Sequence, residues 1–123
     1  SPLISDAVIC GLNAEYLAAL VWLNRAAAER YFERNLPDTS EDLACDMELR
    51  SWVVETLGEY NERNPGSSTR IKRIGFLIEP PSIDGHEISD KGTVNQSVAL
   101  QRRANDVERL YAEIPDNFVI TLD

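Results

Sequence analysis

The chain has 123 residues, 43% of them hydrophobic, which is enough for one domain with a modest core. Its 12 Lys and Arg against 21 Asp and Glu give a formal net charge of -9, a balance that repels a phosphodiester backbone and argues against nucleic-acid binding. No apolar run approaches the roughly 20 residues that span a bilayer, and the start lacks a secretory pattern, so we expect a cytoplasmic protein without membrane contact.

The N-terminal part of the chain predicts two strands followed by a helix. Residues 5–11 (SDAVICG) and 15–23 (EYLAALVWL) are short apolar runs separated by about four residues, so an antiparallel hairpin is the simplest arrangement. Residues 24–35 are rich in helix formers, with Asn24 as a possible N-cap and Pro37 closing the segment.

Residues 40–63 predict a long amphipathic helix whose first turn carries Glu41 and Asp42, where the helix dipole favours negative charge. Its apolar residues recur at helical spacing, so we expect one buried face, with Trp52 in the core. A stripe of methionine and aromatic residues could also line a cofactor cleft, but the helical period favours core packing. The stripe consists of Leu43, Met47, Trp52, Val53, Leu57 and Tyr60.

The C-terminal half predicts a strand at residues 70–78, a helix at 96–112 and a β-prone run at 118–122 that either adds an edge strand or stays unpaired. On the helix, Arg102, Arg103 and Arg109 are expected to point away from the apolar face, which holds Val94, Val98, Ala104, Val107, Leu110 and Tyr111. The fold class is therefore α+β: a small three-stranded mixed sheet covered by about three helices.

The two cysteines, Cys10 and Cys45, form no CxxC pair, and two cysteines in a chain of this size do not indicate a disulfide scaffold. Neither has a basic neighbour in sequence that would lower its thiol pKa. We expect both to be small buried residues.

The loop between the third strand and the last helix holds most of the functional signal. Four side chains within it could ligate a metal, but their spacing fits no standard calcium or zinc loop, so we predict no metal site. Asn95 fits a glycosylation pattern that only a secreted protein would use. The four possible ligands are Asp84, His86, Glu87 and Asp90.

Lys91 is the lone lysine of this acidic loop, beside Gly92. A lysine ammonium can neutralise negative charge that develops on a carboxylate or phosphate oxygen, and an adjacent glycine lets a ligand approach the backbone. From the pattern alone, the competing interpretation is a solvated surface charge.

The segment EPPSIDGHEISDKGTVNQ (79–96), followed by VALQRRANDVERLYA (98–112), closely resembles the C-terminal end of AMP-forming CoA ligases, in particular their feruloyl-CoA synthase-like branch. In that branch an EPPSID…GEITDKG..NQ pattern leads into an arginine-rich helix that ends in ERLYA. DAVICGLN (6–13) and EYLAALVWLN (15–24) resemble the strand pair that comes earlier in the same domain. The resemblance covers residues 4–112 and is most specific at 79–111.

The resemblance implies an enzyme with two half-reactions. A small-molecule carboxylic acid and ATP, bound with Mg²⁺, give an acyl-adenylate, and CoA then displaces AMP to give the thioester. The small C-terminal domain swings between two poses on a large N-terminal adenylation domain. Lys91 is the candidate for the loop lysine that reaches the carboxylate and the α-phosphate, and a gapless alignment on Gly92 offers Thr93 at that position instead.

The same resemblance implies that some basic residues contact the CoA phosphates or the large domain, whereas the residues themselves fit ion pairs with surface carboxylates as well. These residues are Lys72, Arg73, Arg102 and Arg103. The hinge, the glycine-containing hairpin and the large domain of the family are not found before Ser1, so we interpret residues 1–123 as a single partial C-terminal domain.

Such a piece is expected to be inactive alone, because one lysine cannot bind ATP, orient the acid and stabilise the transition state. The acid would be aromatic, of the feruloyl type. The alternative function is a non-catalytic interaction module whose acidic surface binds a basic protein partner, an interpretation that rests on the net charge of -9.

Overall fold

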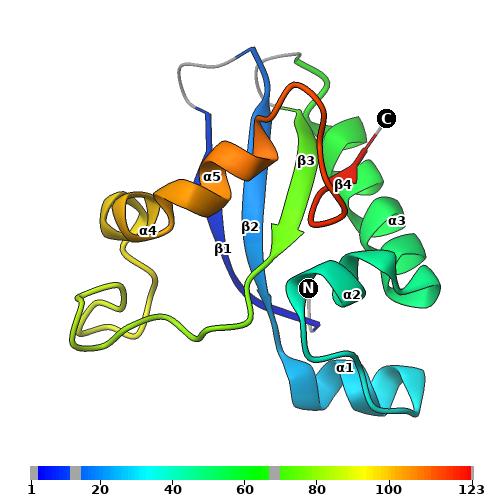
Figure 1. The fold of residues 1–123 in the computed structure, drawn as a ribbon, viewed down its shortest axis with the longest axis horizontal. Helices are drawn as coiled ribbons and strands as arrows, with labels where there is room; N and C mark the ends of the chain where they lie inside the picture. Colours follow the sequence, from blue (N-terminus) through cyan, green and yellow to red (C-terminus); the bar gives the residue numbers. More distant parts are fainter. Residues whose placement is uncertain (1–2, 12–14, 67–69, 123) are drawn as a thin grey trace.

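The computed structural model describes residues 3–11, 15–66 and 70–122, which form an α+β fold around a four-stranded mixed sheet (Figure 1). In spatial order, β1 (Ile4–Cys10) is antiparallel to β2 (Leu17–Leu23), and β2 is parallel to β3 (Ile71–Phe76). The short strand β4 (Ile120–Thr121) is antiparallel to β3. The predicted hairpin and the three main strands are confirmed, and the C-terminal run takes the edge-strand alternative.

Five helices lie among the described residues, because each of the two long predicted helices is interrupted once. The interruption at Asp46 has a local cause: its backbone is extended (φ -70°, ψ 114°) and its side chain accepts a hydrogen bond from the Leu49 N–H. One residue therefore ends one helix and caps the next. The helices are α1 (Arg25–Phe32), α2 (Ser40–Cys45), α3 (Met47–Arg63), α4 (Gln96–Arg102) and α5 (Ala104–Leu110).

Capping side chains set the beginnings of the other helices of the first half. The Asn24 side chain accepts from the Ala27 N–H at 3.1 Å, as predicted for the start of α1. Thr39 accepts from the Asp42 N–H at 3.1 Å at the start of α2. Each cap satisfies a donor that would otherwise lack a partner in the first turn. None of the helices in the described part of the chain is both long and apolar enough to cross a bilayer.

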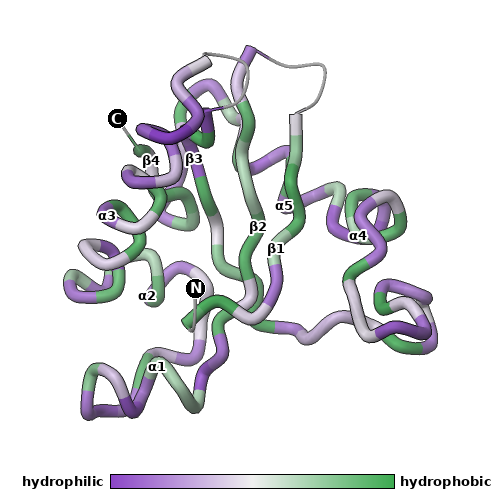
Figure 2. Tube along the Cα trace, turned by 180° about the vertical axis from the view of Figure 1, so that it is seen from behind, coloured by the Kyte–Doolittle hydropathy of each residue, from purple (hydrophilic) through white to green (hydrophobic). Residues whose placement is uncertain are grey.

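The sheet separates two hydrophobic clusters (Figures 1 and 2). Helices α2 and α3 cover one face, and α4 and α5 cover the other. The residues of β2 alternate between the clusters, with Ala19 and Val21 facing α3 and Leu20 and Trp22 facing α5. Trp22 is therefore on the same side of the sheet as the loop that contains Lys91.

The amphipathic stripe of α3 is shifted from the predicted one. Leu49 and Val53 are fully buried at i, i+4 spacing, and Trp52 is half-buried against the same cluster. The assignment of Met47 to the buried face was wrong, because its side chain is 72% exposed. The break at Asp46 resets the helical phase, so the stripe does not continue from α2 through Met47.

Two further burial predictions need correction. Cys10 is buried in β1, but Cys45, the last residue of α2, is exposed. Ala104 is exposed because α5 begins with it after an interruption at Arg103. The Ala104 prediction rested on helical spacing, which does not carry across the interruption at Arg103. The Cys45 prediction rested on composition alone.

Candidate functional site

The loop between β3 and α4 begins pinned to β2 and then extends away from the sheet past α4, as the yellow-green segment of Figure 1 shows. The Leu77 N–H donates to the Val21 carbonyl at 2.8 Å. One residue farther along β2, the Trp22 indole N–H donates to the Glu79 carbonyl at 2.7 Å. These bonds fix the direction in which residues 80–95 leave the sheet.

The second half of the loop is a small hairpin of residues 88–94, called here the Lys91 hairpin. Ile88 and Val94 form an antiparallel bridge. Inside it, the Ser89 N–H donates to the Thr93 carbonyl at 2.8 Å, and the two side-chain hydroxyls lie 2.9 Å apart. The hydroxyl of Thr93 therefore has a partner within the hairpin.

Asp90, Lys91 and Gly92 form the tip, which closes through a 2.9 Å bond from the Gly92 N–H to the Ser89 carbonyl. Gly92 has φ +82°, the left-handed conformation that ends the three-residue type of hairpin loop. Lys91 is exposed, and its ammonium contacts no partner among residues 3–11, 15–66 and 70–122. The glycine thus has a conformational reason to follow the lysine.

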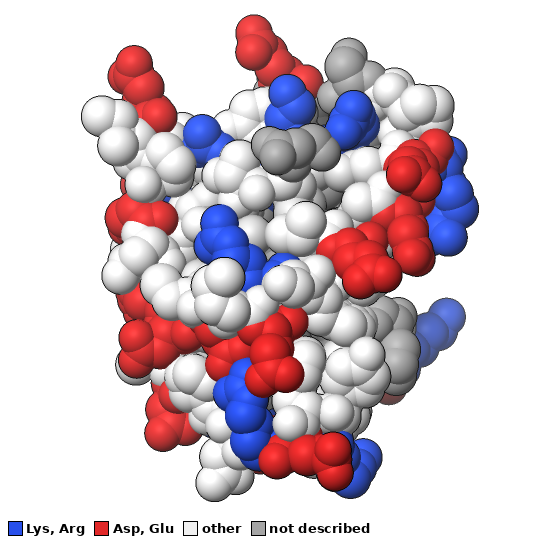
Figure 3. Space-filling view, turned by 90° about the vertical axis from the view of Figure 1, so that its right-hand side faces the viewer, with Lys and Arg blue, Asp and Glu red and all other residues white. Residues whose placement is uncertain are grey.

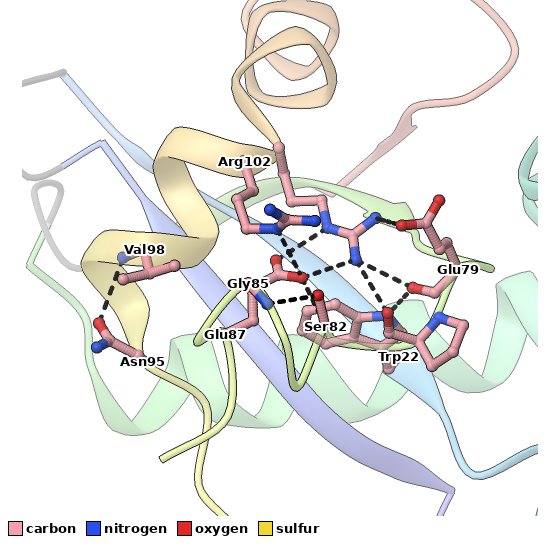
Figure 4. Close-up of polar contacts among 10 residues, drawn as sticks. Trp22, Glu79, Ser82, Gly85, Glu87, Asn95, Val98 and Arg102 are labelled. Atoms are coloured by element: carbon pink, nitrogen blue, oxygen red, sulfur yellow. Dashed lines mark hydrogen bonds and ion pairs between the residues drawn. The ribbon is translucent and has the colours of Figure 1, made fainter.

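A buried ion pair lies at the base of this hairpin. Glu87 is fully buried, and Arg103 is 9% exposed. The Arg103 Nε donates to Glu87 Oε2 at 3.1 Å, and Nη2 donates to Oε1 at 3.2 Å. Ser82 donates its N–H to Oε1 at 2.8 Å (Figure 4). Both carboxylate oxygens are therefore used inside the protein.

The guanidinium of Arg103 also reaches the first half of the loop. Its Nη2 donates to the carbonyls of Glu79 and Pro80, each at 3.2 Å. The same group lies 5.4 Å from the Trp22 ring centroid, a distance typical of cation–π contact. The prediction that Arg103 points away from the apolar face was therefore wrong. Ala99, Arg103 and Val107 recur at helical spacing, and this is the signal that would have placed Arg103 inward.

The surroundings of the Glu87 carboxyl favour its charged form. Burial alone would raise the pKa of the Glu87 carboxyl, but the Ser82 N–H and the Arg103 guanidinium together outweigh it and lower that pKa. Arg102 adds a weaker contact, with Nε 3.4 Å from Glu87 Oε1. Its guanidinium covers Gly85, where an added Cβ would lie 2.6 Å from Arg102 Cζ (Figure 4).

The predicted cations are not gathered in one place. Lys72 and Arg73 lie near the beginning of β3, whereas Lys91 belongs to the loop that follows its end. Arg73 donates to the carbonyls of Leu110 and Ala112 at 2.8 and 2.7 Å, so it joins β3 to the end of α5. Lys72 is exposed and lies 5.7 Å from the Tyr16 ring.

The residues considered as metal ligands do not converge either. Asp84, His86 and Asp90 are exposed, and Glu87 is engaged by Arg103. Within residues 3–11, 15–66 and 70–122, no group of three or more His, Cys, Asp or Glu side chains is placed to hold a metal ion.

A separate, shallow groove of about 650 Å³ lies between α1 and the first half of α3. Met47 and Trp52 line it together with Tyr31, which is 61% exposed. Glu48 and Glu55 also line it. Two residues of the stripe that was predicted to pack in the core, Met47 and Trp52, thus line an open surface groove.

Glycine at position 92 can be tested against a glycine of α3. Gly92→Ala should reduce the free energy of unfolding by about 1 kcal/mol, because alanine is strained at φ +82° although no atom lies within 4 Å of the new Cβ. Gly58→Ala, also with open space around it but in a helix, should instead stabilise by about 1 kcal/mol. Urea unfolding of both variants measures this; equal effects of the same sign would contradict the left-handed tip.

Comparison with known proteins places these features in a family. The family model described as "AMP-binding enzyme C-terminal domain" matches residues 1–115. A protein of Schizosaccharomyces pombe (strain 972) named homoserine O-acetyltransferase is 28% identical in an alignment 120 residues long, and the match covers 83% of this chain. The match spans only 24% of the yeast protein. No solved structure gives a significant match.

Proposed function

Because the chain belongs to the family of AMP-binding enzyme C-terminal domains, we propose that it is the mobile C-terminal domain of an AMP-forming acid–CoA ligase. The observation that carries this proposal is Lys91, an exposed lysine without a partner among the described residues, at the tip of a hairpin that Gly92 closes. The proposed partner is a large adenylation domain in the same polypeptide, which would bind ATP with Mg²⁺, the acid and CoA.

Lys91 would act in the first half-reaction. When a carboxylate oxygen attacks the α-phosphate of ATP, negative charge builds up on the phosphate oxygens and pyrophosphate leaves. An ammonium placed beside these oxygens stabilises that transition state more than the ground state. Its lack of an intramolecular partner leaves it available for this contact, whereas the Thr93 hydroxyl is engaged by Ser89. We therefore propose Lys91, and not Thr93, as the catalytic group.

The substrate that we propose is an aromatic carboxylic acid of the feruloyl type, on the resemblance of residues 79–111. The name of the yeast relative describes acetyl transfer to homoserine, so CoA and homoserine have to be compared directly as acyl acceptors. The test uses the full-length natural protein. It should catalyse pyrophosphate exchange into ATP that depends on ferulate or a similar acid, and should form a thioester with CoA but no ester with homoserine. Absence of exchange with every acid tested would overturn the proposal.

The exposed cations Lys72 and Arg102 are the proposed contacts to CoA phosphates or to the large domain, because Arg73 and Arg103 are held in internal hydrogen bonds, whereas Arg102 makes only the weaker 3.4 Å contact to Glu87. Lys72→Glu and Arg102→Glu should each raise the KM for CoA several-fold, since reversal replaces attraction to a phosphate by repulsion. Arg63→Glu, at an exposed position in the last turn of α3, serves as a control for the same change in net charge. A residue whose reversal leaves both the KM for CoA and stability unchanged has no such contact.

A second candidate function, an interaction module, is favoured by the groove between α1 and α3. Its aromatic and methionine side chains, interspersed with acidic ones, fit a basic, partly apolar partner. Figure 3 shows Asp and Glu side chains across the middle of the face seen from the right of Figure 1, with fewer Lys and Arg between them. The natural reading frame decides between the candidates. Several hundred upstream residues with a Gly, Ser and Thr-rich phosphate loop support the ligase, and a start codon near residue 1 supports the module.

A further inference from the structure

We propose that Glu87 and Arg103 are positioning residues, which set the direction in which the Lys91 hairpin presents its ammonium. The inference rests on the function proposed above and concerns a buried pair that this function does not otherwise use. It also gives Arg103 a role different from the predicted contact with CoA.

Both ends of the hairpin are joined at Glu87. The Asn95 N–H, directly after the hairpin, donates to the Glu87 carbonyl at 2.7 Å. On the other side, the Glu87 N–H donates to the Ser82 carbonyl at 2.9 Å, and the Ser82 N–H returns a bond to Glu87 Oε1 at 2.8 Å. The backbone and the side chain of one residue therefore connect the hairpin to the rest of the loop.

Arg103 connects Glu87 to the rigid part of the domain. Its guanidinium spans the carboxylate and the carbonyls of Glu79 and Pro80, and it lies against the Trp22 ring of β2. The residue itself lies at the junction of α4 and α5. The sheet, the helices and the hairpin thus all contact the planar guanidinium of Arg103. A lysine could not replace it, because an ammonium lacks the several N–H donors that a guanidinium holds in one plane.

The position of the hairpin tip depends strongly on the orientation of the hairpin at Glu87 and Arg103. Lys91 is four residues beyond Glu87, so the tip lies roughly 10 Å from the base, and a rotation of about 10° would move it by about 2 Å. Misplacing a catalytic group by about 1 Å can slow a reaction by roughly 100-fold. Loss of the pair should therefore reduce adenylate formation even where the fold persists.

Arg109 provides a matched control. It also makes charged contacts to carboxylates, with its Nη2 3.1 Å from Glu41 and 3.0 Å from Asp116. It also covers an aromatic ring, at 4.3 Å from the Phe118 centroid. Its partners lie outside the loop, so Arg109→Lys removes a similar arginine fork without touching the base of the hairpin.

The kinetic test uses the full-length protein. Arg103→Lys should lower kcat for adenylate formation roughly 10- to 100-fold and leave the KM for ATP and acid within about twofold. CoA thioester formation from synthetic acyl-adenylate should be unchanged, and Arg109→Lys should affect neither step. Equal loss in both half-reactions, or an equal loss in Arg109→Lys, would overturn the inference. Glu87→Gln, which keeps the volume and one acceptor, gives the same test if Arg103→Lys fails to fold.

A second readout does not depend on activity. Spin labels on the natural Cys45 and on Lys91→Cys report the distance between α2 and the tip in the 123-residue chain. Cys45 is exposed, whereas burial raises the pKa of the Cys10 thiol to about 11, so Cys10 should resist labelling. Glu87→Gln should broaden or shift the distance distribution, and Arg109→Lys should not. If the distance distribution of Glu87→Gln is the same as that of the unsubstituted chain, the inference is overturned. If the distribution changes but the full-length protein shows no acid-dependent exchange, the positioning role stands and only the proposed function is overturned.

Discussion

Replacing Lys91 by alanine in the full-length protein is expected to slow adenylate formation by roughly 100- to 1000-fold, the range for removing one group that stabilises a developing charge. The ammonium has no partner within the described part of the chain, so its removal breaks no internal bond and should leave stability nearly unchanged. Acid-dependent pyrophosphate exchange at saturating ATP measures the step.

Thr93→Ala is the matched comparison for Lys91, since it removes a side chain two residues away in the same hairpin. It breaks the contact between the hydroxyls of Ser89 and Thr93 but leaves the backbone bonds of the tip. We expect a loss of less than about tenfold. If Thr93→Ala damages the exchange reaction more than Lys91→Ala, the catalytic charge has been placed wrongly and Lys91 is a surface lysine.

The second large effect is on stability. Arg103→Ala should reduce the free energy of unfolding by about 3 to 5 kcal/mol, because it leaves the fully buried Glu87 carboxylate without its cation. The double variant Glu87→Gln/Arg103→Ala should recover part of this loss, since it removes the charge that would be stranded. Urea unfolding of the single and double variants gives the coupling energy.

The same pair predicts a pH dependence. The folded-state pKa of Glu87 is lowered, so its contribution to stability is present above the ordinary carboxyl pKa and is lost as the pH falls through the lowered value. Glu87→Gln should flatten this loss of stability at acid pH.

Arg109→Ala, whose partners are more than a third exposed, should reduce the free energy of unfolding by about 1 kcal/mol or less. Equal losses in Arg103→Ala and Arg109→Ala would contradict the special role of burial.

The sheet could be predicted because its information is local. Alternating and apolar runs predicted the three main strands, and the short connection predicted the antiparallel pairing of β1 with β2. The fold class followed from the mixture of these strands with helical periods. The edge strand β4 is only two residues long, and its pairing with β3 is set by tertiary contact, so the sequence left both alternatives open.

The helix interruptions could not be predicted from periodicity. By sequence Asp46 fits a polar position of a continuous helical pattern, but in the structure it accepts from the Leu49 N–H and pairs with Arg34, and the first of these bonds makes it a cap. The consequence was the wrong placement of Met47. The prediction that Cys45 is buried was wrong for a different reason. It rested on composition, which says that cysteine is usually buried but not which side of a short helix a given cysteine occupies.

The candidate site was predicted in part. Lys91 and Gly92 stood out through the resemblance, and the positive φ of Gly92 gives that motif a physical reason. The pair of Glu87 and Arg103 joins residues 16 positions apart, which no local pattern encodes. From the sequence, Glu87 was therefore considered only as a possible metal ligand, in a site that was predicted to be absent, and Arg103 was predicted to contact CoA.

The Lys91 charge is expected to serve only the step in which the acid attacks ATP. The most direct measurement supplies wild-type protein and Lys91→Ala with synthetic acyl-adenylate and CoA, and compares thioester formation with adenylate formation from acid and ATP. The variant should lose the adenylation step by roughly 100-fold or more and keep the second step within about twofold. Normal adenylation by Lys91→Ala, or an equal loss in both steps, would contradict it.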